Sequence, residues 1–300
     1  MKPPPFAYHA PRDLGEALRT LAGVRGKVLA GGQSLIPMLN MRLAAPEHVV
    51  DINRLESLAV VERAGDGVRV GALARHAQVA RSGAHPLLTK ALRLVAHPVI
   101  RNRGTVVGSL VHADPAAELP AVLAILGGSV RVARWAPEPA ASPGGVPVGA
   151  VVRDVPADEF FVGPMESDVR PDELAVSAFF PALGERTGTA FEEVSRRHGD
   201  YALAGVCAVV TLDEDLRIAA ARVACIGVGP APVLVDVTRE CDRRPPASVD
   251  WTAVARAVRD RTDPDGDVHA TAAYRRHLVG VLAERALRNA AREGTASGGA

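Results

Sequence analysis

The sequence predicts an α+β fold in two parts: a mixed region of short strands and helices, then a small antiparallel sheet with helices. Residues 1–175 alternate short apolar runs with amphipathic stretches of helical spacing. Residues 204–212 and 216–226 are β-like runs that the turn at 213–215 joins into a hairpin. Helical patterns at 251–261 and 272–292 come after these strands. This grouping indicates α+β rather than a regular βαβ array.

The first part, residues 1–175, is expected to hold two α+β sub-domains, at about 1–55 and 56–175. The expected helices are 13–22, 35–43, 86–96 and 118–126, and the expected strands are 27–29, 48–52, 58–62, 68–72, 129–135 and 174–180. The third and fourth of these strands flank an Ala-Gly-Asp-Gly turn and are expected to form a hairpin. Residues 101–109 and the Pro/Gly/Ser-rich stretch 136–149 are expected to be loops.

The second part, residues 176–290, is expected to be a C-terminal domain built on the second hairpin and the last two helices. Residues 181–189 are expected to form a turn after the strand at 174–180. The end of the chain, residues 291–300, is rich in small and polar residues and is expected to be disordered.

Composition limits the classes of function. The 300 residues are 48 % hydrophobic and carry a net charge of +1, so no large basic field exists to attract nucleic acid or an anionic membrane. Neither a signal peptide nor a transmembrane stretch is visible, so a cytoplasmic protein is expected. The three cysteines, Cys207, Cys225 and Cys241, have no CxxC spacing. They are expected to be small buried hydrophobes rather than ligands of zinc or an iron–sulfur cluster.

The first segment with chemical potential runs from Leu29 to Leu35 and reads Leu-Ala-Gly-Gly-Gln-Ser-Leu. A diphosphate needs several converging N–H donors, and glycine allows its oxygens to approach the backbone closely. A helix that begins after an N-cap at Ser34 adds its free amides and the positive end of its dipole. The segment also fits an ordinary strand–turn–helix in which glycine serves the turn.

Two further segments fit the same ligand. Residues 101–109, Arg-Asn-Arg-Gly-Thr-Val-Val-Gly-Ser, combine glycine, hydroxyl groups and two cations, although a structural loop with a solvated Arg pair is also possible. In residues 112–118, Asp114 is suited to cap the following helix, and Glu118 is suited to accept a ribose or ribityl hydroxyl. His112 and Asp114 lack a visible third ligand, so no metal site is predicted.

Two segments of the second part complete the candidates. In residues 195–202, Tyr201 is suited to stack on or edge a flat ring, or the segment is a basic turn before a strand. Residues 226–232 faintly resemble a dinucleotide-binding glycine motif, but the third glycine is absent and Pro230 breaks the helix, so a structural turn is expected. No catalytic triad, P-loop or metalloprotease motif is present. No catalytic residue is therefore predicted.

Taken together, four motifs in this order resemble the FAD-binding medium subunits of carbon monoxide dehydrogenases and xanthine dehydrogenase-type molybdenum hydroxylases. They are AGGQSLIPMLNMRLAAPEHVVDI, IRNRGTVVGSLVHADPAAELPAVL, SRRHGDYALAGVCA and GVGPAPV. The resemblance spans the chain from about Phe6 to Leu287. It implies a p-cresol-methylhydroxylase-type FAD-binding domain with a separate C-terminal domain.

The resemblance also implies which residues hold FAD. The stretches Ala30–Ser34 and Thr105–Ser109 match those that hold the diphosphate, Glu118 matches an acidic contact, and Asp114 and Tyr201 match positions near the flavin. The expected cofactor-binding residues are Ala30, Gly31, Gly32, Gln33, Ser34, Leu35, Thr105, Val106, Gly108, Ser109, Asp114, Glu118 and Tyr201.

One position departs from the family pattern. The second loop of the family usually has two adjacent glycines, and Val107 stands in place of the first. A β-branched residue rarely adopts a positive φ, and its side chain is able to crowd a diphosphate. If the backbone is extended there, the side chain instead fits by turning away.

The function that the resemblance implies is electron transfer by FAD within a heterotrimer that further dimerises. A large molybdopterin subunit would oxidise the substrate, and a small subunit with two [2Fe–2S] clusters would pass electrons through FAD to quinone, NAD or oxygen. Two alternatives remain at this point. One is a stand-alone flavoprotein oxidase or dehydrogenase with His198 or Tyr201 near the flavin. The other is a scaffold that has lost FAD, which the valine at position 107 suggests.

Overall fold

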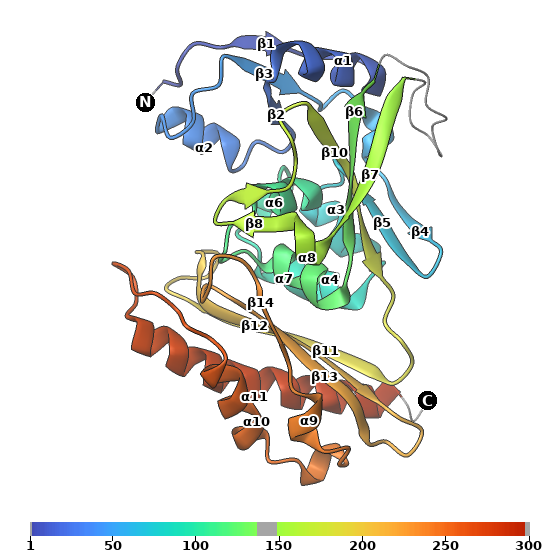
Figure 1. Cartoon of the computed structure of the whole chain (residues 1–300), viewed down its shortest axis with the longest axis vertical. Coiled ribbons are helices and arrows are strands. Elements are labelled where there is room, and N and C mark those ends of the chain that lie inside the picture. The colour runs from blue at the N-terminus through green and yellow to red at the C-terminus, as the bar shows by residue number, and fades with distance from the viewer. Residues whose placement is uncertain (1, 137–148, 298–300) are drawn as a thin grey trace.

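The computed structural model describes residues 2–136 and 149–297 and confirms the α+β class. Figure 1 shows three sheets following one another along the long axis of the molecule, with helices between the second and third sheets and outside the third. The predicted loop at 136–149 falls almost entirely outside the described residues. No described helix is both long and apolar enough to span a bilayer.

The first sheet is small and parallel, with strand order β1-β3-β2. Its elements are β1 (Ala7–His9), α1 (Leu14–Val24), β2 (Lys27–Leu29), α2 (Leu35–Asn40) and β3 (His48–Asp51). Asp13 caps α1 by accepting a hydrogen bond from the amide of Glu16 at 2.8 Å. Helix α2 begins directly after the predicted glycine turn, so this sheet presents that turn at its edge.

The second sheet has five antiparallel strands in the order β4-β5-β10-β6-β7. They are β4 (Val61–Ala64), β5 (Gly67–Gly71), β6 (Ser129–Trp135), β7 (Ala150–Pro156) and β10 (Glu173–Pro181). Pairing of Val61 with Val70 confirms the first hairpin, although its first strand runs from 61 to 64 rather than from 58 to 62, because residues 56–58 form a 3₁₀ turn. Strand β7 was not predicted.

Helices fill the space beside this sheet and below it. They are α3 (His76–Ser82), α4 (Pro86–Leu94), α5 (Pro98–Arg101), α6 (Val106–His112), α7 (Glu118–Leu126) and α8 (Ala157–Phe160), and a short ribbon follows in β8 (Phe161–Gly163) and β9 (Glu166–Ser167). Helix α6 corrects the prediction of a loop at 101–109. Thr105 caps it by accepting a hydrogen bond from the amide of Gly108 at 3.1 Å, which favours a helical start there.

The third sheet is antiparallel, in the order β11-β12-β13-β14, and is apolar on both faces. Its strands are β11 (Thr187–Ser195), β12 (Ala202–Leu212), β13 (Ile218–Ile226) and β14 (Val233–Asp236). Along β12, Val206 and Val210 belong to a core with the outer helices, whereas Cys207 and Val209 belong to the core of the first domain. Two-sided burial accounts for the continuous apolar sequence of this strand.

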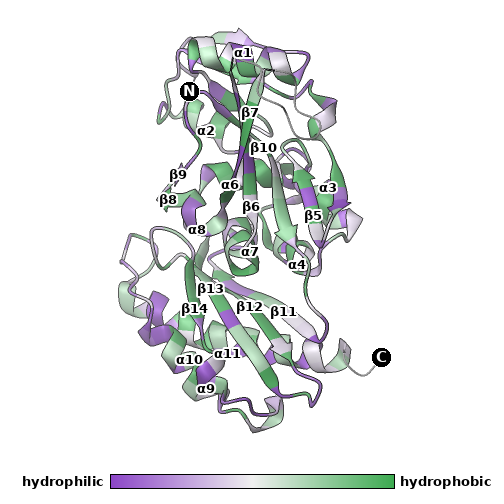
Figure 2. Ribbon diagram, turned by 45° about the vertical axis from the view of Figure 1, so that its right-hand side comes forward, coloured by the Kyte–Doolittle hydropathy of each residue, from purple (hydrophilic) through white to green (hydrophobic). Residues whose placement is uncertain are grey.

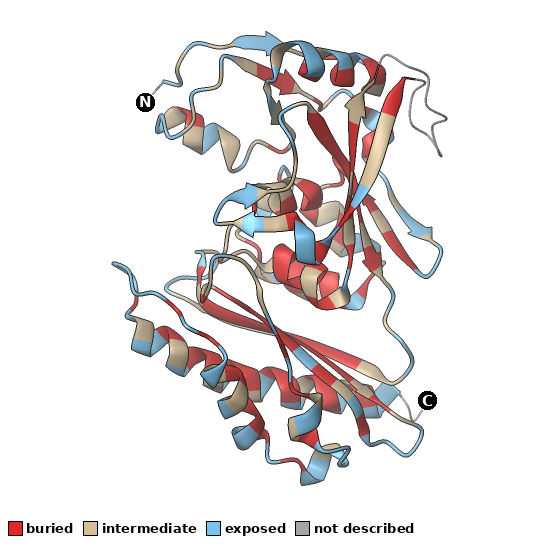
Figure 3. Ribbon diagram, viewed as in Figure 1, coloured by how far each residue is buried: buried red, intermediate tan, exposed pale blue. Residues whose placement is uncertain are grey.

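Three helices cover the outer face of the third sheet: α9 (Thr238–Cys241), α10 (Trp251–Asp260) and α11 (Ala272–Ser297). A second 3₁₀ turn, Pro246–Ser248, precedes α10. In Figure 2, hydrophilic residues gather on α9 and α10, while α7, between the second and third sheets, is largely hydrophobic. Figure 3 shows α7 buried along most of its length. The third sheet is therefore held between α7 on one side and α11 on the other, with α10 packed on α11.

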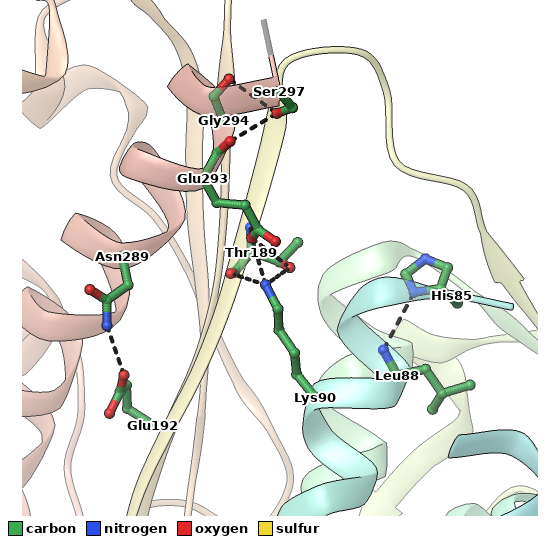
Figure 4. Close-up of polar contacts among 9 residues, drawn as sticks. All are labelled: His85, Leu88, Lys90, Thr189, Glu192, Asn289, Glu293, Gly294 and Ser297. Carbon is green, nitrogen blue, oxygen red and sulfur yellow. Dashed lines mark hydrogen bonds and ion pairs between the residues drawn. The ribbon is translucent and has the colours of Figure 1, made fainter. Parts of the chain in front are cut away.

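Helix α11 runs on to Ser297, so the prediction of disorder from residue 291 is wrong for 291–297, and 298–300 lie outside the described residues. Polar contacts at its end provide the reason. Glu293 accepts hydrogen bonds from Lys90 Nζ on α4 at 2.5 Å and from the amide of Thr189 on β11 at 2.6 Å (Figure 4). Asn289 also donates to Glu192 at 2.9 Å. These contacts order the end of the helix and join it to the first domain.

The change from the second sheet to the third occurs later than the expected boundary at residue 175. Strand β10 remains paired with β5 up to Pro181, and β11 begins at Thr187. The region 181–189, predicted to be a turn, therefore includes the start of β11. Its Thr-Gly-Thr sequence carries few of the apolar residues that mark a strand.

Candidate cofactor-binding site

A cavity of about 360 Å³ lies where the first sheet, the helices of the second sheet and the start of β12 meet. Almost all of the predicted cofactor-binding residues line it: Ala30, Gly31, Gly32, Gln33, Ser34, Leu35, Thr105, Gly108, Ser109, Asp114, Glu118 and Tyr201. Val106 does not, because its side chain is fully buried in the core and its amide donates to the carbonyl of Ala74. The structure thus brings four separated motifs to one place.

The first glycine turn offers a row of free donors. Within the described residues, the backbone amides of Gly31 through Leu35 have no hydrogen-bond acceptor, and the first paired amide is that of Ile36. Ser34 occupies the N-cap position of α2, as predicted, and its side chain makes no capping bond. Several unpaired amides at the start of a helix suit an anion such as a diphosphate.

Glycine is required at two positions of this turn. Gly32 has φ +74°, a conformation that L residues with side chains rarely adopt. A Cβ atom on Gly31 would lie 2.5 Å from the carbonyl oxygen of Arg103 and 2.8 Å from Cα of Gly104. Gly31 therefore allows the turn to rest directly on the segment that precedes α6.

Asn53 and Arg75 connect the two motifs by hydrogen bonds. Asn53 Nδ2 donates to the carbonyl of Ala30 at 2.8 Å, and Asn53 Oδ1 accepts from Arg75 at 2.7 Å. The other guanidinium nitrogen of Arg75 donates to the carbonyl of Arg103 at 2.7 Å. Sequence reasoning missed both residues, because neither stands in a glycine motif and a single sequence carries no signal of this pairing.

The second motif is the start of a helix, and most of its amides are already used. Those of Val106, Gly108 and Ser109 donate to Ala74 O, Thr105 Oγ1 and Thr105 O. Ser109 Oγ lies 3.0 Å from Nε2 of His76, which lines the cavity and was also missed. Burial lowers the pKa of His76 to about 4, so this imidazole is neutral at pH 7.

Val107 does not cause the difficulty that its sequence position suggested. It lies within α6, it is not among the residues with positive φ, and its side chain is 2 % exposed and packs in the hydrophobic core. The backbone is helical rather than extended. Val107 is among the residues that line the cavity, but its side chain is almost wholly buried, so it leaves little surface to crowd a ligand. The reason to expect a scaffold without cofactor is therefore weak.

The segment Asp114–Glu118 forms another wall. The prediction that Asp114 caps α7 is wrong, because Ala117 is the N-cap residue. Asp114 Oδ1 instead accepts a hydrogen bond from the amide of Ala116 at 2.8 Å. Glu118 opens the helix and lines the cavity. Burial, together with the charge of Glu193 on β11, raises the pKa of Glu118 to about 8. Glu118 is therefore largely protonated at pH 7 in the chain alone.

The C-terminal domain contributes the rim of the cavity. Gly199, Asp200 and Tyr201 lie between β11 and β12 and line the opening, and Tyr201 remains 65 % exposed. Gly199 has φ +85°, and a Cβ there would lie 2.6 Å from the ring of His97. Tyr201 thus presents a free aromatic face beside the predicted site.

Other candidate sites have fewer features of a binding site. A depression of about 560 Å³ lies on the second sheet, but its charged walls pair with one another, as in Arg69–Glu62 and Arg131–Asp154. Within the described part of the chain, no group of three or more His, Cys, Asp or Glu is placed to hold a metal. Cys207, Cys225 and Cys241 are buried free thiols, as predicted.

Comparison with protein families assigns a class to this fold and site. Residues 4–141 match the model of the FAD binding domain in molybdopterin dehydrogenase, and residues 189–290 match that of the CO dehydrogenase flavoprotein C-terminal domain. The first match covers the first sheet and the second sheet up to β6, and the second match covers most of the third sheet and its outer helices. The class is therefore that of an FAD-binding subunit of a molybdopterin-dependent oxidoreductase.

Whole-chain relatives narrow the class. The chain is 39 % identical to the 6-hydroxypseudooxynicotine dehydrogenase complex subunit alpha of Paenarthrobacter nicotinovorans, over 97 % of this chain and 96 % of the relative. It is 35 % identical to the carbon monoxide dehydrogenase medium chain of Hydrogenophaga pseudoflava, over 96 % and 97 %. A chain of quinoline 2-oxidoreductase from Pseudomonas putida 86 superimposes with a TM-score of 0.85 at 30 % identity, over 98 % and 99 %.

The chain belongs to the family of FAD-binding medium subunits of molybdenum hydroxylases. This membership confirms the family resemblance, the two-domain fold and FAD as the cofactor. The chain is therefore a subunit of an FAD-dependent oxidoreductase that works in a multi-subunit complex. The cavity fits the cofactor chemically, because free amides face it on one side and an exposed aromatic ring on another.

Proposed function

We propose that this chain holds FAD in the cavity between the Gly31–Leu35 turn, helix α6 and Tyr201. The observation that carries the proposal is the row of unpaired amides from Gly31 to Leu35 on the cavity wall. These donors bind the diphosphate, with Thr105 and Ser109 on its other side. Asp114, Glu118 and Tyr201 contact the rest of the cofactor.

When bound, FAD supplies redox chemistry that exchanges single electrons with one partner and electron pairs with another. The chain binds and orients the cofactor and shields it from water on one side. A small subunit with two [2Fe–2S] clusters delivers the electrons, and quinone, NAD or oxygen accepts them. A large molybdopterin subunit oxidises the substrate, and the heterotrimer dimerises.

Substrate choice is proposed to reside outside this chain. The names of its relatives refer to 6-hydroxypseudooxynicotine, carbon monoxide and quinoline, although all three relatives match nearly the whole chain at 30–39 % identity. A subunit that contacted each substrate would need different side chains in its cavity.

The test begins with the visible spectrum of the purified full-length chain and a titration with FAD. Flavin absorbance, lost in Gly31→Ala but kept in Gly23→Ala, supports the proposed position, because a Cβ on Gly23 meets nothing within 4 Å. A chain that takes up no FAD contradicts the proposal. Purification from the native host then identifies co-purifying subunits, and a free monomer that oxidises substrate by itself would favour a stand-alone flavoprotein.

A further inference from the structure

Arg275 on α11 is a buried arginine that joins three segments. It is 7 % exposed, and one guanidinium nitrogen donates to the carbonyls of Leu203 and, at 3.0 Å, of Gly227. Its other terminal nitrogen donates to Asp267 Oδ2 at 2.7 Å. Burying a guanidinium is unfavourable unless such partners are supplied, and its planar shape fixes where they must lie.

The two carbonyls mark the cavity ends of β12 and β13. Leu203 follows Tyr201 by two residues, and Gly227 comes directly after β13. The amide of Gly227 donates to the carbonyl of Pro115 at 2.9 Å, which links the C-terminal domain to the wall that carries Asp114 and Glu118. Arg275 is therefore connected to two edges of the cavity: through Leu203 to the strand end that follows Tyr201, and through Gly227 and Pro115 to the segment that carries Asp114.

The Gly227 turn is shaped for this contact. Gly227 has φ +71°, and a Cβ there would lie 2.8 Å from the carbonyl oxygen of Leu203. This accounts for the first glycine of the Gly-Val-Gly segment, which the cofactor site does not otherwise use. The turn brings both carbonyls to one guanidinium.

Asp267 keeps the arginine in place. Its Oδ1 accepts the amides of His269 and Ala270, and these bonds, with the one from Arg275, lower the pKa of Asp267 to about 2. Nε of Arg275 is buried without a partner among the described residues. Packing alone does not explain a buried guanidinium with an unpaired N–H, since an apolar side chain of similar volume would fill the same space without the desolvation cost.

We infer that Arg275, held by Asp267, is a positioning residue that fixes the Tyr201 rim against the Pro115 wall and so sets how closely the two domains enclose the cofactor. The inference rests on the proposed position of FAD. Arg275 itself does not line the cavity, so it acts through the strand ends.

The test compares Arg275→Lys, Arg275→Gln and Asp267→Asn with Arg276→Gln in the full-length chain. Arg276 is the matched control, because it adjoins Arg275 but pairs with exposed Asp263. Arg275→Gln is expected to weaken FAD binding about tenfold and Arg275→Lys about threefold. Iodide should quench the fluorescence of bound flavin more strongly in both, whereas Arg276→Gln should match the wild type.

A double-mutant cycle with Tyr201→Ala identifies the route. The effect of Arg275→Lys on iodide quenching should largely vanish in the Tyr201→Ala background, because the rim is then already open. If Arg275→Lys and Asp267→Asn lower the melting temperature but leave FAD affinity and quenching unchanged, Arg275 is only structural and the inference is overturned. If Arg275→Gln does not fold, Arg275→Lys and Asp267→Asn still distinguish a positioning role from a purely structural one. Unchanged FAD affinity in Gly31→Ala would overturn the cofactor position instead.

Discussion

The two glycine-containing motifs look alike in sequence, but they differ in what they offer a ligand. The first leads into the short helix α2, and the second forms the start of the short helix α6, both on the cavity wall. At Gly31–Leu35 the amides have no partner in the part of the chain that the structure describes, and Ser34 makes no capping bond. At Thr105–Ser109 the Thr105 hydroxyl caps the helix, and three amides have protein acceptors. The first motif is therefore a donor surface, and the second is a preformed support.

The difference teaches that glycine content alone does not define a phosphate-binding turn. What matters is whether the amides remain without partners once the helix has formed. Gly31 serves both motifs, since its missing side chain lets the Arg103 carbonyl approach. The predictions below test this division, from the largest expected effect on FAD affinity to the smallest.

Gly31→Ala is expected to have the largest effect. The added Cβ meets backbone atoms at 2.5 and 2.8 Å, which cannot move aside as a flexible side chain can. Overpacking of this kind costs about 1–3 kcal/mol, so FAD affinity should fall by up to about 100-fold. Titration of the flavin-free chain with FAD measures it. If Gly31→Ala binds FAD as tightly as Gly23→Ala does, the first motif is not the donor surface.

Arg75→Gln is expected to weaken FAD binding about tenfold, because one charged hydrogen-bond donor then no longer links the two motifs. Glutamine cannot reach both Asn53 and the Arg103 carbonyl, which Arg75 contacts at 2.7 Å each. Arg81→Gln, an exposed change on the same helix, is the control. Equal dissociation constants for the two variants would show that the motifs hold their spacing without the bridge.

Glu118→Gln tests the wall that belongs to neither motif. Glutamine keeps an acceptor oxygen, so FAD affinity should change by less than about threefold. Stability should change more clearly with pH. The pKa of Glu118 is about 8 in the folded chain and ordinarily 4.5, so the unfolded chain releases this proton first as the pH rises. Stability of the flavin-free chain should therefore fall between about pH 4.5 and 8, by on the order of 1–3 kcal/mol.

The measurement is the melting temperature of the flavin-free chain across this pH range. Glu118→Gln should flatten the decline, and Glu118→Gln with Glu193→Gln should flatten it further, because burial raises the pKa of Glu193 to about 7. Glu214→Gln, in the exposed turn between β12 and β13, should leave the decline unchanged. If the melting temperature of the double variant still falls as steeply with pH, titratable groups other than Glu118 and Glu193 cause the fall.

The sequence predicted the elements whose pattern is local. Strand 27–29, helix 118–126 and strand 129–135 were predicted with the bounds that the structure has, because apolar periodicity and flanking glycines mark them. Strands β7 and β14 were missed, since they lie at sheet edges, where pairing with a neighbour outweighs local pattern. Strand β1 was missed for a related reason, because its three residues pair only with β3.

The site divides in the same way. The place of motif residues such as Gly31 and Thr105 on the cavity wall could be predicted, because their chemistry is visible along the chain. Asn53, Arg75, His76 and Arg275 were not, because each acts through contacts with residues distant in sequence. Helix α6 was read as a loop, since its glycine resembled a turn signal while the Thr105 cap was overlooked.

Val107→Gly should have the smallest effect on FAD affinity, within about twofold, and it tests the support role of the second motif directly. Removing a buried side chain from the core and placing glycine in a helix should lower stability by about 2–4 kcal/mol. Val99→Gly is the control, since Val99 lies in α5 with 77 % exposure and should cost only the helix preference. Flavin titration and urea unfolding measure the two quantities. A tenfold gain in affinity would mean that the valine limits the diphosphate, and the second motif would then have to be regarded as a restricted donor surface rather than a support.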